Sequence, residues 1–322
     1  MKRCSLPLLI LICLAVLICP VILIAGCSSV PPRPAEVFNI QSMAETQMAL
    51  ANKEADQGNY SEALAILAEA WRLAVTTDRP ALRIRVNMAR ANALHALGRT
   101  AEAEKIWRDA EVEANFAGEP VLASAGRIYR TRSMILSGRV DPAEALASAQ
   151  KEQEILKSDK LLSAVGWTVR GLAEKELGLY EEAEKSVMNA LAVHDKERYL
   201  EQAAYDWYLI ASIRSTAGNY EAALEALNRA LGFDRRAENT FGLAMDWAAM
   251  GDVFLKMENE NSAALSWRRS AEIFRAMDRN AQAREVESRV KQTGREDSIR
   301  NPRTGGASPA PTPAGDPLLP SP

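Results

Sequence analysis

Cysteine and histidine are scarce in this sequence and proline is missing from a long stretch of it, and each absence bears on a class of structure or chemistry. The four cysteines stand at positions 4, 13, 19 and 27 of 322 residues, so the chain after Cys27 has no disulfide and no cysteine metal site. Only two histidines are present, His95 and His194, and they lie far apart in the sequence. No proline stands between Pro142 and Pro302, which favours uninterrupted helices because proline breaks the helical hydrogen-bond ladder.

Signatures of catalysis and of nucleic-acid binding are also missing. The sequence contains no His, Asp and Glu cluster at metal-ligand spacing, no glycine-rich phosphate loop after a strand and no Gly-x-Ser-x-Gly motif. Without Lys2 and Arg3, 37 of the 39 basic residues remain against 42 acidic ones, a net charge of −5 that does not suit a nucleic-acid binder. We therefore expect a protein that is not an enzyme, with no metal, cofactor, small-molecule substrate or nucleic-acid partner.

What the sequence does contain is an internal repeat, in which similar residues recur at every fortieth position. A fixed period of this size indicates one supersecondary unit stacked on copies of itself. Three series of residues carry the pattern: a glycine series with one departure, an invariant alanine series and a series of small residues. They are Gly58, Gly98, Gly138, Gly178, Gly218 and Glu258; Ala63, Ala103, Ala143, Ala183, Ala223 and Ala263; and Ala51, Ala91, Thr131, Gly171, Ala211 and Gly251.

Each unit is predicted to be two helices joined at the glycine. The segments Gly-Asn-Tyr-Ser-Glu-Ala-Leu at 58–64 and Gly-Leu-Tyr-Glu-Glu-Ala-Glu at 178–184 are clear examples of this turn. Glycine suits a helix that ends in the left-handed conformation, since it has no Cβ to clash. The tyrosine is expected to fill the corner, and the small residues facing each other allow the two helices to approach closely.

The Gly-x-Tyr-x-x-Ala turn, with its small residue seven places earlier, resembles the tetratricopeptide repeat. Trp167, Trp207 and Trp247 match the aromatic position 4 of that repeat when the units start at 44, 84, 124, 164, 204 and 244. HEAT-type repeats have a period of about 40 residues as well, but they do not explain the turn. The resemblance implies an all-α, right-handed superhelical solenoid of about six helix hairpins over residues 44–294, with a charged C-terminal capping helix at 279–292.

The repeat length departs from this family. The tetratricopeptide standard is about 34 residues, and the period here is longer, at about 40 residues. Roughly three extra residues in each helix, or longer loops between the repeats, would account for the difference.

Two repeat positions that the family hairpin places opposite each other are charged together or apolar together. In repeats 1, 5 and 6 both are apolar, and in repeats 2, 3 and 4 an arginine faces a glutamate. Structural ion pairs are one interpretation, because a lone charge against an apolar partner would be left unpaired; a row of functional cationic contacts is the other. The predicted pairs are Arg90 with Glu104, Arg130 with Glu144, and Arg170 with Glu184.

Residues 1–26 are predicted to be a lipoprotein signal peptide. A basic start is followed by an apolar stretch, which ends in Ile24-Ala25-Gly26-Cys27. This tetrapeptide resembles the bacterial lipobox, which implies a palmitate-type lipid on Cys27 after cleavage. Ser28 after the cysteine implies sorting to the outer membrane, facing the periplasm, in a Gram-negative source. An uncleaved transmembrane anchor is the alternative, since the stretch is long enough to span a bilayer.

The segments that flank the repeats have a different composition. Residues 27–43 are predicted to hold the lipidated cysteine and a stiff proline-rich tether. Residues 295–322 are rich in proline, glycine and serine and are predicted to be disordered. This tail is either a ligand for a partner or a solvated end.

The first helix of each unit is expected to line a groove that binds a protein or peptide segment. Asparagine at family position 9 resembles members that hold an extended peptide by its backbone amides, because an amide side chain donates and accepts at once. The groove is expected to be polar and basic in its N-terminal half, and apolar and aromatic further along. The candidate residues are Asn52, Arg85, Asn92, His95, Arg132, Tyr205 and Tyr208.

The sequence therefore favours a non-catalytic scaffold, held to the outer membrane by its lipid. By analogy of architecture alone, it would recruit partners for an envelope, secretion or pilus-type assembly. An adaptor that regulates peptidoglycan enzymes is the second hypothesis, and an enzyme is a distant third.

Overall fold

The computed structural model describes residues 39–292, all of which belong to one compact unit. The predicted signal peptide, the lipidation site at Cys27, most of the tether and the proline-rich tail lie outside the described residues. Within residues 39–292 the chain forms thirteen helices and no strand. They are α2 (Asn39–Asp56), α3 (Tyr60–Thr76), α4 (Pro80–Ala96), α5 (Thr100–Phe116), α6 (Pro120–Leu136), α7 (Pro142–Leu156), α8 (Lys160–Glu176), α9 (Tyr180–Lys196), α10 (Leu200–Thr216), α11 (Tyr220–Ala237), α12 (Thr240–Lys256), α13 (Glu260–Ala276) and α14 (Asn280–Gln292).

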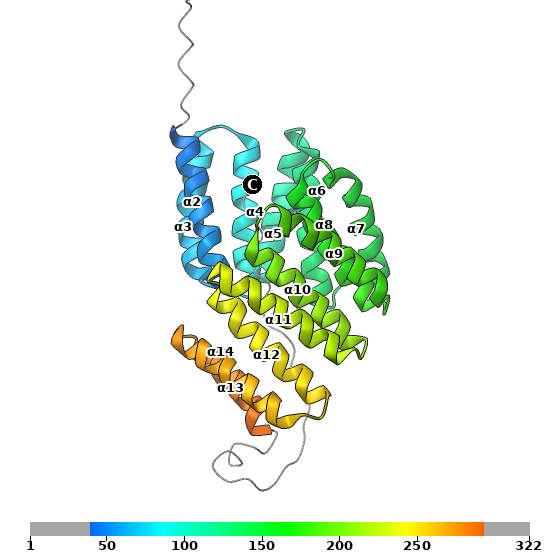
Figure 1. Ribbon diagram of the computed structural model, residues 1–322. Coiled ribbons are helices and arrows are strands. Elements are labelled where there is room, and N and C mark those ends of the chain that lie inside the picture. Colours follow the sequence, from blue (N-terminus) through cyan, green and yellow to red (C-terminus); the bar gives the residue numbers. More distant parts are fainter. Residues whose placement is uncertain (1–38, 293–322) are drawn as a thin grey trace, which may run out of the picture. The chain divides into compact units, whose positions relative to one another are not determined.

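The helices pack in sequence order as six hairpins followed by a single helix (Figure 1). Within each hairpin an even-numbered helix packs on the next odd-numbered one, and each hairpin then packs on the following hairpin. The predicted all-α solenoid of six hairpins with a capping helix is thereby confirmed. The first helix begins at Asn39, ahead of the predicted repeat start at Ala44.

The long period comes from longer helices, not from longer loops. Most of the helices are 17 residues long, and most of the turns between them are short. All five predicted turn glycines have positive φ, from Gly138 at 63° to Gly218 at 84°, and Glu258 adopts the same conformation at 60°. Three of the turns between hairpins, and the turn before α14, also contain a non-glycine residue with positive φ, such as Asp78 at 50°. One helix and its turn therefore make up half of each period.

The third hairpin departs from the alanine series. The period places the start of its second helix at 140, but α7 begins at Pro142, where the side chain of Asp141 accepts hydrogen bonds from the backbone N–H groups of Ala143 and Glu144. Ala143 is therefore in the first turn and exposed, and Ala145 takes the buried place. In the other five hairpins the alanine of the series is fully buried, as predicted.

The last helix covers the end of the array. Val286 and Val290 of α14 are buried in one cluster with Trp267 and Phe274 of α13. The guanidinium of Arg289 donates to both carboxylate oxygens of Asp252 on α12, at 3.0 and 2.9 Å. Arg289 thus links the capping helix α14 to the sixth hairpin through these hydrogen bonds.

The first and last parts of the array also touch each other. The guanidinium of Arg279, between α13 and α14, donates to the carbonyl oxygen of Gly58 in the first hairpin turn and lies over the ring of Phe241, 5.4 Å from its centroid. The ring of Tyr60 meets the same Phe241 edge-on, with centroids 6.4 Å apart. We call this contact the clasp.

Candidate binding cavity

A cavity of about 560 Å³ lies on the inner side of the array. Its lining comes from the first helix of every hairpin, namely α2, α4, α6, α8, α10 and α12, together with Asp234 of α11 and the turns. This volume falls in the range of about 300–1,000 Å³ that is typical of ligand-binding cavities. The first helices therefore do form the inner surface, as the repeat pattern predicts.

Aromatic side chains form one part of the wall. The rings of Tyr205 and Tyr208 on α10 are stacked at 6.3 Å with an interplanar angle of 13°. Arg132 on α6 donates to the Tyr205 hydroxyl at 3.1 Å and lies over its ring at 5.4 Å, so this ring already holds a cation on one side. Phe241 of α12 also lines the cavity.

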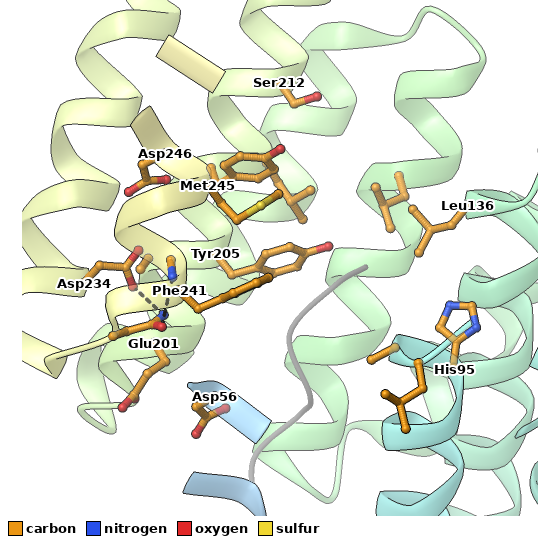
Figure 2. A pocket seen from close by; sticks show the side chains of 18 of the residues that line it. Asp56, His95, Leu136, Glu201, Tyr205, Ser212, Asp234, Phe241, Met245 and Asp246 are labelled. Atoms are coloured by element: carbon orange, nitrogen blue, oxygen red, sulfur yellow. Dashed lines mark hydrogen bonds between the residues drawn. The ribbon is translucent and has the colours of Figure 1, made fainter. Parts of the chain in front are cut away.

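His95 lies on another part of the wall. Figure 2 shows His95 and Leu136 on one side of the cavity, with Tyr205, Phe241 and the acidic side chains on the other. The His95 ring packs against Trp107 at a centroid distance of 5.7 Å, and its Nδ1 lies 3.4 Å from the hydroxyl of Ser133. Both neighbours limit the orientations that the imidazole can take.

Four carboxyl groups line the cavity: Asp56, Glu201, Asp234 and Asp246. Asp234 and Asp246 are buried, with exposed fractions of 3% and 2%. Burial raises the pKa of Asp234 to about 7, while burial and the neighbouring Asp234 charge raise the pKa of Asp246 well above its usual value. Burial also raises the pKa of Asp56, with a smaller contribution from the charge of Glu201.

The carboxyl groups of Asp234 and Asp246 are close enough for each to influence the pKa of the other. Oδ1 of Asp234 also accepts from the side chain of Asn239, at 2.9 Å, and Asn239 in turn caps α12 through the N–H of Gly242 (Figure 2). A Cβ on Gly242 would overlap Oδ2 of Asp234, so glycine at this place admits the carboxyl. Within the described residues, Oδ2 of Asp246 accepts no hydrogen bond from any N–H or hydroxyl group.

Of the seven predicted groove residues, the structure brings four to this cavity. His95, Tyr205 and Tyr208 line it, and Arg132 contacts Tyr205. Asn92 is not part of the lining. Its side-chain oxygen accepts a hydrogen bond at 3.2 Å from the indole of Trp107, the ring against which His95 packs.

The other two predicted residues lie elsewhere. The charge that the sequence predicts for the N-terminal half of the groove is also wrong. Asn52 is buried and does not line the cavity. Arg85 lies 3.7 Å from Asp159 and lines a separate hollow between α2 and α4. The expected polar and basic half is not what the cavity presents. Among residues 39–292 its charged lining is mainly acidic, and Lys175 is the only basic side chain there apart from His95.

The three predicted ion pairs are also wrong. Arg90 donates to Asn87 and lies over Trp71, Arg130 pairs with Glu111 at 2.8 Å, and Arg170 pairs with Glu174 at 2.7 Å. Glu104 pairs with Arg139 and Glu184 with Arg214 of the following hairpin, while Glu144 is exposed in the shifted helix α7. Long side chains find partners within their own helix, as Arg90 and Arg170 do, or across the interface between hairpins, as Arg130 does. The prediction considered only the two positions that face each other within one hairpin.

The acidic residues escaped the sequence analysis, although a signal was present. Asp246 is the single charge in the apolar stretch 241–251, and Asp206 stands one period earlier in a similar position, each directly before a tryptophan. A lone carboxyl on the buried face of a helix needs a partner or a function. The spacing of the repeat would have indicated both residues together.

Neither metal binding nor membrane crossing has support in the described part of the chain. Between residues 39 and 292, no three His, Cys, Asp or Glu side chains are arranged to hold a metal ion. No helix of that part is long and apolar enough to cross a bilayer.

Comparisons with known proteins agree with this architecture. Residues 207–236, which cover most of the α10–α11 hairpin, match the family model described as tetratricopeptide repeat. No curated protein sequence matches the chain significantly.

Among solved structures, the chain is similar to a Rap protein complexed with competence and sporulation factor. The TM-score is 0.53 at 15% identity, and the match covers 79% of this chain and 76% of that chain. Aspartyl phosphate phosphatase F from Bacillus subtilis has a TM-score of 0.47 and 13% identity, with coverage of 84% and 74%. A tetratricopeptide repeat protein from Parabacteroides merdae has a TM-score of 0.38 and 15% identity, with coverage of 80% and 96%. At 15% identity, the similarity to the Rap protein concerns the fold alone.

Proposed function

Because the chain is a tetratricopeptide-repeat protein, we propose that it is a non-catalytic scaffold that holds a segment of a partner protein in the inner cavity. The observation that carries the proposal is the cavity itself, lined by the first helix of all six hairpins. Its volume of about 560 Å³ suits a few residues of an extended segment and is too small for a folded domain. Solenoids commonly use their concave surface to bind such segments.

The composition of the wall supports a peptide-like ligand. Tyr205, Tyr208 and Phe241 offer apolar contact area, and their rings are already positioned by stacking or by arginines. A preorganised wall loses little entropy when a ligand binds. His95 and Ser212 add polar groups for hydrogen bonds with a peptide backbone.

The proposal includes anchoring through a lipid on Cys27. Its support is the sequence pattern of residues 24–27, which resembles a lipobox. A lipid at that place would hold the repeat array at a membrane surface, at the periplasmic face of the outer membrane in a Gram-negative source, where it would recruit partners for an envelope assembly.

Site-specific cross-linking from inside the cavity tests the proposal. A photo-reactive amino acid replaces Leu136, which lines the cavity and is 46% exposed. The matched control places the same group at Glu225, exposed on α11. We expect a defined protein adduct in the native host from position 136 and none from position 225.

The outcome is read from the adducts. Secretion, pilus or other envelope-assembly components would support the assembly role, whereas peptidoglycan enzymes would support the adaptor role. Equal adducts from both positions, or none from position 136, would show that the cavity does not hold a partner.

A further inference from the structure

Two pairs of residues occupy equivalent places in successive repeats, and they differ in charge. His194 and Asp206 lie one period before Asp234 and Asp246. In the first pair, Nδ1 of His194 lies 2.6 Å from Oδ2 of Asp206, and both side chains are fully buried. In the second pair the histidine is replaced by a second carboxyl group.

The first pair contains a group that can carry a positive charge beside the carboxylate, and the second pair does not. An imidazole next to a buried carboxylate supplies a proton donor and, when protonated, a compensating charge. Asp234 supplies at most one shared proton and no positive charge to Asp246. Asp246 is almost completely buried, and its Oδ2 accepts no hydrogen bond from any N–H or hydroxyl in residues 39–292. Each pair keeps one carboxylate oxygen without a hydrogen-bond partner in this part of the chain, Oδ1 of Asp206 and Oδ2 of Asp246, but only the second pair has no group that can carry a positive charge.

The pair of carboxyl groups lines the cavity, while the His194–Asp206 pair does not. Asp234 and Asp246 both line the cavity, together with Glu201 and Asp56, whereas neither His194 nor Asp206 lines it. Within residues 39–292, two basic groups are nearby: Lys175 lies 3.7 Å from Glu176, and the exposed Arg235 acts on Asp246 through its charge, with no hydrogen bond or ion pair between the two side chains.

Aromatic rings beside the carboxyls favour an organic cation. The protein's own arginines lie over two of the cavity rings, Arg132 over Tyr205 and Arg279 over Phe241, each at 5.4 Å. Aromatic faces attract guanidinium and ammonium groups, and carboxylates bind them by charge-assisted hydrogen bonds. Figure 2 shows Tyr205, Phe241 and the acidic side chains together on one side of the cavity.

We propose that the partner segment inserts an arginine or lysine side chain into the cavity, where its cation binds the Asp234–Asp246 pair and takes the role that His194 has beside Asp206. This proposal rests on the function proposed above and adds the chemistry of the ligand. The remaining carboxyls, Glu201 and Asp56, increase the negative potential and select against acidic segments.

Immobilised peptides test the proposal with the full chain purified in detergent. One library contains acetylated and amidated heptapeptides with arginine fixed at the centre, and the other has the uncharged analogue citrulline there; the other positions are random and lack Lys and Arg. We expect at least tenfold more binding to the arginine library, because citrulline keeps the shape and removes the charge. Soluble spermidine, a small polycation, is the competitor in a third arm.

Two variants assign the preference to the carboxyl pair. Asp246→Asn removes one charge at constant shape, and Asp234→His reproduces the arrangement of His194 and Asp206. Both are expected to abolish the preference for arginine. The matched control Glu221→Gln, an exposed carboxyl on α11, should retain it. Circular dichroism and thermal unfolding check that each variant is folded.

Each outcome bears on a specific statement. Equal binding of the two libraries, or a preference that survives in both folded variants, overturns the cation proposal and leaves the scaffold function intact. If spermidine binds more tightly than the arginine library and displaces it, the ligand is a polyamine and the peptide proposal is wrong. Absence of binding to either library, with the Leu136 cross-link retained, also overturns the cation proposal alone; loss of both overturns the scaffold function as well.

Discussion

Arg279 donates a hydrogen bond to the carbonyl oxygen of Gly58, although 221 residues separate them in the sequence. The same guanidinium lies 3.3 Å from the side-chain oxygen of Asn59 and over the ring of Phe241. The clasp thus joins the first hairpin to the sixth hairpin and to the turn that follows it. Asp56 and Phe241, from its two sides, both line the cavity. The contact that closes the array therefore also brings together residues that line the cavity.

Removal of the guanidinium should loosen the clasp. We expect Arg279→Ala to lower the free energy of unfolding by about 1.5–3 kcal/mol, the usual contribution of a hydrogen bond to a charged group. Amide hydrogen exchange should increase at residues 58–60. The control Arg99→Ala removes an exposed pair with Glu102, which contributes little. Equal effects of the two variants would show that the clasp contributes no stability.

Two turn glycines with the same conformation should respond differently to alanine. Gly58 and Gly98 have φ of 76° and 77°, so alanine has a similar backbone cost of about 1 kcal/mol at both. A Cβ on Gly58 would lie 2.8 Å from Cδ2 of Phe241, whereas a Cβ on Gly98 meets nothing within 4 Å. We expect Gly58→Ala to destabilise the fold by about 1–3 kcal/mol more than Gly98→Ala. Similar melting temperatures would mean that Phe241 moves away without cost.

The carboxyl pair should make stability fall as the pH rises. The pKa of Asp234 is about 7 in the folded protein, above its ordinary value of 3.8, and that of Asp246 is also raised. Between these values the folded state holds more protons than the unfolded state, so the free energy of unfolding decreases with pH and the loss is complete above the folded-state pKa. The charge of Glu201 on α10 raises the pKa of Asp234, and Arg235 lowers that of Asp246.

Denaturant unfolding at several pH values measures this effect. We expect stability to fall by roughly 2–4 kcal/mol between about pH 5 and about pH 8. Asp246→Asn should flatten the slope, because Asp234 then ionises without a second charge beside it. Glu221→Gln should keep it. Parallel slopes for the wild type and Asp246→Asn would contradict a role for the pair.

Lipidation at Cys27 has a direct chemical test. We expect the protein from its own host to begin at Cys27 and to carry acyl chains, as seen by mass spectrometry, and to sediment with membranes. Cys27→Ser should leave the precursor uncleaved and without acyl chains. An intact N-terminus without a lipid on Cys27 in the wild type would overturn the anchoring proposal.

The sequence by itself determined the number of hairpins, their turns and the helices that face inward. These features follow from local rules that recur in every repeat: glycine for the left-handed turn, alanine where helices cross closely, and the periodicity of the helix itself. Even Glu258, the one departure in the glycine series, keeps the left-handed turn conformation, with a φ of 60°. Because these local patterns recur in every repeat, they can be recognised without knowing how the hairpins pack on each other.

Only the tertiary structure decided which side chains meet between hairpins. The partners of Arg130, Glu104 and Glu184 and the acidic wall depend on how one hairpin is rotated against the next. The contact between Arg279 and Gly58 depends on the sum of these rotations over the whole array. No local pattern encodes that sum, because each small rotation results from the packing of side chains that are distant in the sequence.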